Sequence, residues 1–511
     1  HGEVRVLGTS GTGDDAAAFR ALQDRLGPMY RDIFFDDNAP RTVVVVPSLS
    51  LDQEVLGKIS GVHHYEERML CLLLLLRLPR TELVFLTSKP VPETIIDYYL
   101  HMLPGIPAQH ARRRLKLFSC HDGSAMALSE KLLARPRLLE RIRQAISDPA
   151  RTHMTCFNVT ALERRLALAF DIPLYGCDPD LIELGSKSGS RKIFREAGVE
   201  LPDGSEDLRD AQDVAEALAA LKGRLPGLER AVVKLNEGFS GEGNAVFDFR
   251  GAPESGNVGK WVGEQLPSLR FESPEMTWEL YQEKLMSMAG IVEAFVEGGE
   301  RRSPSAQVRI DPLGKVHAIS THDQVLGGPN AQIFLGSRFP ADAAYRLEIQ
   351  EQGMRVAEAL AAKGVRGRLG VDFISVRGAA GWRHMAIEVN LRKGGTTHTF
   401  DMLHFLTDGR YDRERGLFLT QQDEARYYYA SDNLEAEAYR GLTPSDLIDI
   451  AALNRLHFHQ TTQEGVAFHL VGALSEFGKL GILCIGKTPE RAEELRRRTV
   501  DVLDQETGNC G

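Results

Sequence analysis

Cysteine is scarce in this sequence and nowhere closely paired. The 511 residues include only 6 cysteines, and they are scattered without a Cys-x-x-Cys motif. This scatter excludes a disulfide framework and a zinc knuckle. A reducing, cytoplasmic setting is the simplest expectation.

Long hydrophobic runs and an excess of basic charge are also missing. The one candidate span, residues 69–78, is far shorter than the roughly 20 apolar residues that a membrane crossing needs. We therefore expect no membrane contact and interpret the run as part of a buried helix. The net charge is -10, with both signs interspersed along the chain, which disfavours nucleic acid as a partner.

What remains is the composition of a multidomain globular protein, with 43% hydrophobic and 26% charged residues. Up to residue 180, short apolar strands alternate with helices, which predicts a parallel, doubly wound α/β domain. We expect its strands at 41–47, 82–87 and 115–119, and its helices at 66–78, 128–146 and 161–170. A second α+β domain is expected over 181–435, and a small α+β domain over 436–511.

Residues 370–392 predict two strands joined by a turn of small residues. If this hairpin is symmetric about Ala380, Asp372 lies opposite Glu388, and Asn390 and Arg392 share the face of Glu388. Opposed carboxylates destabilise a sheet unless a cation lies between them. Their oxygens suit Mg²⁺. The alternative is an ordinary solvated face of an antiparallel sheet.

Two lysines lie where cations can reach phosphate groups. Lys234 ends a predicted strand and precedes the glycine-rich loop 237–244, in which Glu237, Ser240, Gly241 and Gly243 are candidate nucleotide contacts. The alternative is a plain hairpin with a surface lysine. Lys187 precedes a short helix whose N-terminus also favours anions, with Lys192 as a competing candidate.

An apolar strand that ends in acids and glycines follows at residues 291–300. Its backbone would suit the edge of an adenine ring, with an acid on the ribose hydroxyls. Surface acids at a strand end explain the same pattern.

The order of these segments carries more information than any one of them. From about residue 184 to 399 the sequence resembles the ATP-grasp ligases, and Glu388–Gly395 fits their terminal motif closely. The leading α/β region, the segments 321–330 and 334–340, and the small terminal unit together resemble the pheganomycin-type peptide ligases.

The resemblance implies an ATP-grasp fold preceded by a Rossmann-like pre-ATP-grasp domain and followed by a small α+β C-terminal domain, with ATP and Mg²⁺ as cofactors. By resemblance, Lys187 and Lys234 bind ATP phosphates, and Asp372, Glu388 and Asn390 bind Mg²⁺. Arg392 contacts a phosphate or an acyl phosphate, and Arg309 is a further catalytic candidate whose alternative is an outward-facing strand residue. The adenine contacts would be Glu293, Ala294, Phe295 and Val296, with Glu297 or Glu300 on ribose.

The function expected is that of an ATP-dependent carboxylate-amine ligase that forms a peptide bond through an acyl phosphate. Its partners would be a small carboxylate and an amine, both of the amino-acid class, and a homodimer is compatible with the resemblance. Two alternatives stay open: a regulatory nucleotide-binding protein, and an NAD-dependent oxidoreductase that uses the leading domain. His398, beside the second strand of the hairpin, is a candidate proton acceptor.

Overall fold

The structure, a computed structural model, describes residues 13–238, 241–327 and 333–508. The predicted contact Ser240 lies outside these residues. In the described parts of the chain, no helix is both long enough and apolar enough to cross a membrane.

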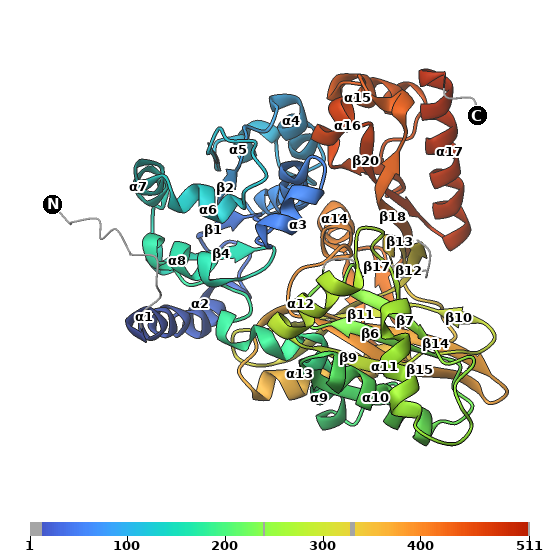
Figure 1. The fold of residues 1–511 in the computed structure, drawn as a ribbon. Coiled ribbons are helices and arrows are strands. Elements are labelled where there is room, and N and C mark those ends of the chain that lie inside the picture. The colour runs from blue at the N-terminus through green and yellow to red at the C-terminus, as the bar shows by residue number, and fades with distance from the viewer. Residues whose placement is uncertain (1–12, 239–240, 328–332, 509–511) are drawn as a thin grey trace.

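The N-terminal part is a parallel sheet flanked by helices, as the sequence predicts (Figure 1). Its four strands lie in the order β3-β2-β1-β4, and each neighbouring pair is parallel. The strands are β1 (Arg41–Val46), β2 (Thr81–Thr87), β3 (Leu115–Ser119) and β4 (Thr152–Cys156). The helices are α1 (Gly13–Gln23), α2 (Leu26–Ile33), α3 (Gln53–Lys58), α4 (Glu93–His101), α5 (Ala108–Arg112), α6 (Leu128–Leu133), α7 (Pro136–Ala145) and α8 (Ala161–Phe170).

Three features of this part differ from the sequence-based prediction. Residues 128–146 form two helices rather than one, because Pro136 lacks an N–H and begins a new helix at its first turn. The expected helix at 66–78 is a 3₁₀ helix, η1 (Val62–Arg77), in which Leu70, Leu73 and Leu76 recur every third residue and are all 0% exposed. Strand β4 was not predicted, because Thr152 and His153 interrupt its apolar pattern.

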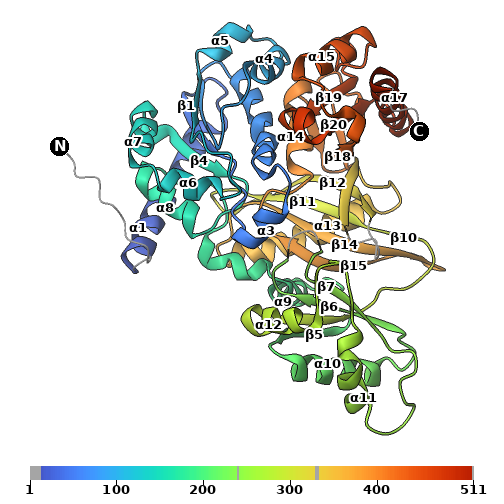
Figure 2. The same ribbon diagram turned by 45° about the horizontal axis from the view of Figure 1, so that its top comes forward.

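A five-stranded antiparallel sheet, in the order β5-β9-β6-β7-β8, forms a compact unit at the bottom of the view in Figure 2. The strands are β5 (Gly204–Leu208), β6 (Arg230–Leu235), β7 (Asn244–Asp248), β8 (Arg270–Phe271) and β9 (Gly290–Ala294). The helices of this region are α9 (Lys187–Glu196), α10 (Ala211–Arg224), α11 (Val258–Gln265) and α12 (Trp278–Met288).

The remaining strands form one sheet of eleven strands. They are β10 (Arg301–Arg302), β11 (Pro304–Ile310), β12 (Val316–Gly327), β13 (Ile333–Phe339), β14 (Gly367–Gly378), β15 (Gly381–Asn390), β16 (Arg410–Asp412), β17 (Leu417–Leu419), β18 (Ala425–Glu435), β19 (Gly465–His469) and β20 (Lys479–Gly486). The helices with them are α13 (Arg346–Ala362), α14 (Thr397–Thr407), α15 (Pro444–Leu453), α16 (Leu474–Phe477) and α17 (Pro489–Thr507). Because β20 pairs with β18, the C-terminal unit continues this sheet. The domain boundaries at 180 and 435 stay predictions.

Helix α14 joins the parts of the molecule. It packs against η1, and one apolar core includes Leu73 of η1, Leu403 of α14 and Phe468 of β19. The N-terminal sheet and the C-terminal unit are therefore held around the same buried helix, next to the end of hairpin β14–β15.

Candidate active site

Hairpin β14–β15 places the predicted metal ligands as expected. Asp372 pairs with Glu388, and Gly370 pairs with Asn390. The turn is Ala379–Ala380, so a regular hairpin would set Ile387 opposite Asp372. A one-residue register shift between Asp372 and Phe373 brings Glu388 there instead.

A cavity of about 410 Å³ lies over this hairpin, between the five-stranded sheet, the large sheet and the N-terminal part. It gathers eight residues singled out from the sequence or adjoining them: Lys187, Lys234, Gly238, Gly241, Asp372, Glu388, Asn390 and Arg392. Residues far apart in the chain therefore share one site, in the combination that phosphate and metal binding requires.

The pKa values of the two opposed carboxylates, Asp372 and Glu388, are shifted in opposite directions. Burial and the neighbouring Glu388 raise the pKa of Asp372 to about 7. Burial alone would also raise the pKa of Glu388, but the Lys187 ammonium, which ion-pairs with it, lowers that pKa. The hydrogen bonds to Asp372 come from neutral groups: its Oδ1 accepts from Gln324 Nε2 at 2.9 Å and its Oδ2 from Asn390 Nδ2 at 3.1 Å. The charges of Arg392 and Lys187 offset only part of the rise in its pKa.

The donor set fits a hard divalent cation. Two carboxylates and one amide supply only oxygen ligands, and the raised pKa of Asp372 marks a place where a proton or a metal ion relieves repulsion. Asn390 also accepts from Arg392 Nη2 at 3.4 Å, which orients the arginine toward the same face. Asp372, Glu388 and Asn390 are the residues that would hold Mg²⁺.

Helix α9 brings Lys187 to this site. Ser186 caps the helix by accepting from Gly189 N at 3.0 Å, and Asn236 Oδ1 accepts from Ser188 N at 3.0 Å, which fastens the helix start to the end of β6. Lys187 is 8% exposed and points at Glu388. Lys192 instead pairs with Asp207 at 2.5 Å, and its side chain is 52% exposed. Of the two candidate lysines, only Lys187 lines the cavity.

Lys234 forms an ion pair with Glu293, a residue that was predicted to contact adenine. Its Nζ donates to Glu293 Oε2 at 3.3 Å, and Glu293 also accepts from Arg191 Nη1 at 3.1 Å. Glu293 is 2% exposed, so its side chain supports Lys234 rather than facing the cavity.

The backbone groups of the other predicted adenine contacts already form hydrogen bonds within the protein. Ala294 N donates to Asp203 O at 2.8 Å, and Phe295 N donates to Arg230 O at 3.1 Å. Val296 O accepts from Arg301 Nη1 at 3.2 Å, and Arg301 lines the cavity. An adenine that contacts Val296 O would therefore have to replace Arg301 or bind the same oxygen beside it. The adenine-binding role of this segment stays a prediction.

Neither candidate ribose acid lines the cavity in this structure. Glu297 pairs with Arg230 at 2.8 Å, and Glu300 pairs with Arg302 at 2.5 Å. The choice between them stays open. In the glycine-rich loop 237–244, Glu237 is exposed, and Gly243 O accepts from Tyr281 Oη at 3.0 Å. Neither Glu237 nor Gly243 lines the cavity.

Arg309 does not join this site, contrary to the catalytic role expected for it. It lies on the same strand as Ser305 and Gln307, which line the 410 Å³ cavity, but it lines a different cavity further along β11. A side chain two residues beyond Gln307 is displaced by about 7 Å along the strand. The position of the sheet beneath the N-terminal part decides this, and no local pattern reveals it.

A charged pair in the cavity wall, Arg68 of η1 and Asp432 of β18, was not predicted from the sequence. Arg68 Nη1 lies 3.7 Å from Asp432 Oδ2, both residues line the cavity, and they are 8% and 6% exposed. The arginine also lies over the ring of Phe157, 4.4 Å from its centroid. The only local sign was a cluster of charges, Glu66-Glu67-Arg68, ahead of an apolar run.

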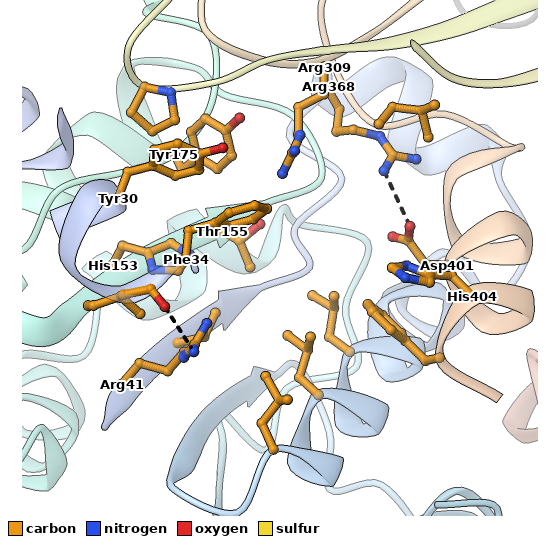
Figure 3. Close-up of a pocket in the computed structure, with 18 of the residues that line it drawn as sticks. Tyr30, Phe34, Arg41, His153, Thr155, Tyr175, Arg309, Arg368, Asp401 and His404 are labelled. Carbon is orange, nitrogen blue, oxygen red and sulfur yellow. Dashed lines mark hydrogen bonds and ion pairs between the residues drawn. The ribbon is translucent and has the colours of Figure 1, made fainter. Parts of the chain in front are cut away.

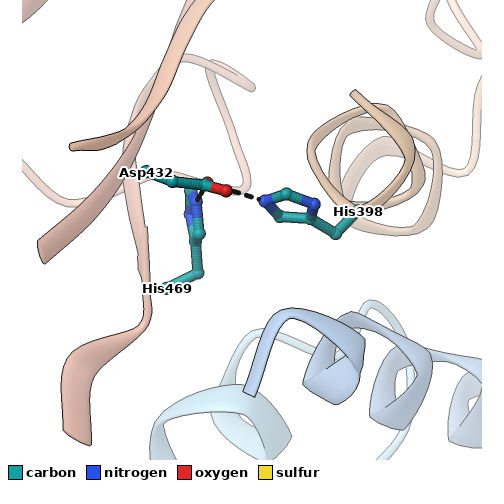
Figure 4. A group of neighbouring side chains, drawn as sticks. All are labelled: His398, Asp432 and His469. Atoms are coloured by element: carbon teal, nitrogen blue, oxygen red, sulfur yellow. Dashed lines mark hydrogen bonds and ion pairs between the residues drawn. The ribbon is translucent and has the colours of Figure 1, made fainter. Parts of the chain in front are cut away.

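Two histidines lie behind this pair and hold Asp432 (Figure 4). His398 Nε2 and His469 Nε2 lie 2.9 and 2.7 Å from the same oxygen, Asp432 Oδ1. Burial alone would raise the pKa of Asp432, but the two histidines hold it well below its usual range. Burial lowers the pKa of His398. Both rings therefore act as donors to an ionised carboxylate, and His398 is a support rather than a proton acceptor at the cavity.

Comparisons with known proteins agree with the fold. Residues 179–260 and 268–414 match the family described as IQCH-like ATP-grasp, and residues 446–499 match the PGM1 C-terminal domain. The chain is 31% identical over 472 residues to L-propargylglycine–L-glutamate ligase of Streptantibioticus cattleyicolor, covering 90% of this chain and 94% of the relative. It is 23% identical over 382 residues to IQ motif-containing protein H of Danio rerio, covering 66% of this chain and 36% of that protein.

Solved structures share the fold at low identity. The 2-oxoglutarate carboxylase biotin carboxylase domain of Hydrogenobacter thermophilus gives a TM-score of 0.54 at 14% identity, covering 90% of this chain and 89% of that one. The biotin carboxylase of Campylobacter jejuni gives 0.53 at 12% identity, with 91% of each chain covered.

Fold and site together define an ATP-grasp enzyme, a ligase that uses ATP to form an amide bond. Within that superfamily, the chain belongs to the pheganomycin-type peptide ligases, the family of L-propargylglycine–L-glutamate ligase. The expected fold class is confirmed, and neither the regulatory protein nor the oxidoreductase is favoured.

Proposed function

We propose that this enzyme activates the carboxylate of one amino acid with Mg²⁺-ATP and joins it to the amino group of another. The acid would become an acyl phosphate with release of ADP, and the amine would then displace phosphate to leave an amide. The observation that carries the proposal is the pair Asp372 and Glu388, opposed in register beside Lys187 in one cavity.

Each residue in the cavity has a role that its position supports. Lys187 and Lys234 would bind phosphate oxygens, because each is a buried ammonium at the cavity wall. Bound Mg²⁺ would neutralise phosphate charge there. Arg392, whose Nη1 donates to Lys393 O at 2.9 Å, is held with its guanidinium in the cavity, where it would stabilise the acyl phosphate.

Arg68 and Asp432 support an amino acid as a substrate. A cation and an anion side by side match the carboxylate and ammonium of a zwitterion, and both side chains are desolvated, which strengthens such contacts. The relative's name joins two amino acids, L-propargylglycine and L-glutamate.

The test is ADP release from purified enzyme with Mg²⁺-ATP and pairs of amino acids, with mass spectrometry of the product. We expect ADP and a dipeptide only when acid and amine are both present. Glu388→Gln should abolish both, because it leaves Lys187 without its anion and removes a metal ligand. Absence of ADP with every pair of the proteinogenic amino acids and of their ω-unsaturated analogues would defeat the proposal.

Substrate recognition has its own test. Asp432→Asn should raise the KM for one amino acid by at least about tenfold while leaving the KM for ATP nearly unchanged, since a charge-assisted hydrogen bond is lost. Asp408→Asn, whose carboxylate pairs with Arg77 on the exterior, is the matched control. Equal effects on both KM values would contradict the assignment. The homodimer and the cytoplasmic location remain predictions.

A further inference from the structure

A second cavity, of about 430 Å³, lies at the opposite end of the N-terminal sheet (Figure 3). Arg41, Thr81 and His153 place it at the beginning of strands β1, β2 and β4, whereas Phe157 places the active-site cavity beyond the end of β4. Its walls are mainly apolar side chains from α2, η1 and α14, such as Met29, Leu72 and Phe400. The two cavities are therefore distinct sites on one face of the large sheet.

Two arginines from neighbouring strands enter this apolar space. Arg309 of β11 and Arg368 of β14 are directly opposite in the antiparallel register. Like charges in this position repel one another, and an apolar surrounding strengthens the repulsion. The repulsion between the two guanidinium groups therefore destabilises the sheet here, and an anion between them would relieve it.

The protein supplies little of that compensation. Arg368 Nη1 donates to Asp401 Oδ1 at 3.3 Å, while its Nε and Nη2 are buried without a partner. Arg309 lies over the ring of Phe34, 4.9 Å from its centroid, and has no hydrogen bond or ion pair with any residue that the structure describes. Several donors of two guanidinium groups are thus left for a ligand.

The cationic side chains of the lining outnumber its carboxylates. Arg41 and Lys393 also line the cavity, but their donors go to neutral oxygens: Arg41 Nη2 to Asp36 O at 2.6 Å, and Lys393 Nζ to Cys156 O at 2.6 Å. Asp401 is the one carboxylate among the lining residues described. The cavity is also lined by two histidines, His153 and His404, and burial lowers the pKa of both, so they add no positive charge near pH 7. Burial raises the pKa of the lining tyrosines, Tyr30, Tyr175 and Tyr411, so they stay neutral there.

We propose that this cavity binds a small carboxylic acid with an apolar body, separately from the nucleotide and the amino acids. The carboxylate would bridge Arg309 and Arg368, whose planar guanidinium groups suit two-point contact with a carboxylate. The apolar body would lie against α2, η1 and α14. Neighbouring residues link the two sites, since Arg392 lines the active-site cavity and Lys393 lines this one.

The test is calorimetric titration of the whole protein with 4-phenylbutanoate, decanoate and indole-3-acetate, with a non-hydrolysable Mg²⁺-ATP analogue bound. We expect at least one acid to bind, and its primary amide to bind at least about tenfold more weakly, because the amide lacks the charge that the arginines recognise. Arg309→Gln should weaken the acid by a similar factor. It should not lower the melting temperature of the free protein, because it removes a repelling charge. Arg250→Gln, on an exposed side chain paired with Asp248, is the matched control.

Ala318→Phe provides a second variant, which places a ring in the cavity and keeps both arginines. It should also abolish binding of the acid. The proposal is overturned if no acid binds in the millimolar range, if acid and amide bind equally, or if Arg309→Gln leaves the affinity unchanged. Competition between the acid and the ATP analogue would overturn it too, by placing the acid in the active site.

Discussion

Replacing Asp372 by Asn should make the metal-free protein more stable at alkaline pH while destroying its activity. The wild-type carboxylate lies opposite Glu388, and together with burial this raises its pKa from the ordinary 3.8 to about 7. Asn has nearly the same shape and no charge. The substitution therefore removes a repulsion that only a proton or a metal ion relieves.

The magnitude follows from proton linkage. Between the two pKa values the folded protein keeps the Asp372 proton that the unfolded chain has lost, so wild-type stability falls as the pH rises. Each unit costs about 1.4 kcal/mol. From pH 5 to a folded pKa of about 7 the loss is at most about 3 kcal/mol, and little is added above that pKa. Because solvent reaches part of this side chain, we expect the advantage of the variant to grow by about 1–3 kcal/mol between pH 5 and pH 8.

The assay is urea unfolding followed by circular dichroism, in EDTA, at pH 5 and pH 8. Asp412→Asn is the control of opposite sign: the Arg415 side chain lowers the pKa of Asp412, so this variant should lose stability at pH 8. With Mg²⁺ and ADP present, the wild type should gain stability at pH 8 and Asp372→Asn should not. If the difference between variant and wild type were the same at both pH values, the assigned repulsion would be refuted.

Two further predictions concern helix α9. Lys187→Met should raise the KM for ATP or lower turnover by at least about tenfold, whereas Lys192→Met should change both by less than about twofold; equal losses would contradict the choice of Lys187. Gly189→Ala should lower the melting temperature, because a Cβ there would lie 2.1 Å from Glu183 O, whereas Gly263→Ala, with nothing within 4 Å, should stabilise by about 0.5–1 kcal/mol. Similar melting temperatures for these two variants would refute the close approach at the start of α9.

Local pattern was enough for the hairpin and for much of the secondary structure. Alternation of apolar residues predicted β14 and β15, and their side-chain faces follow from the period of two. The pairing of Asp372 with Glu388 is confirmed, but it depends on a register shift that the sequence-based symmetry did not contain. The prediction centred the turn on Ala380 instead of on Ala379–Ala380, and it contained no register shift. These two errors cancelled, so the predicted pair was still correct.

Local pattern was not enough where long-range contacts set the structure. Glu293 was expected to contact adenine, yet it is buried in ion pairs with Arg191 of α9 and Lys234 of β6. Such ion pairs join residues 59 and 102 positions apart, beyond the reach of any periodicity.

By itself, the sequence determined the kind of chemistry: two lysines, a carboxylate pair and an amide, in an order typical of ATP-grasp ligases. Residue types and strand alternation are local properties, so a single chain displays them. Only the tertiary structure decided which of these groups meet. It brought Lys187 rather than Lys192 to Glu388, added Arg68 and Asp432 from opposite ends of the chain, and moved Arg309 into a separate apolar cavity. The physical reason is that the side chains lining a cavity between sheets come from positions hundreds of residues apart, and packing between distant segments brings them together. No local pattern encodes that packing.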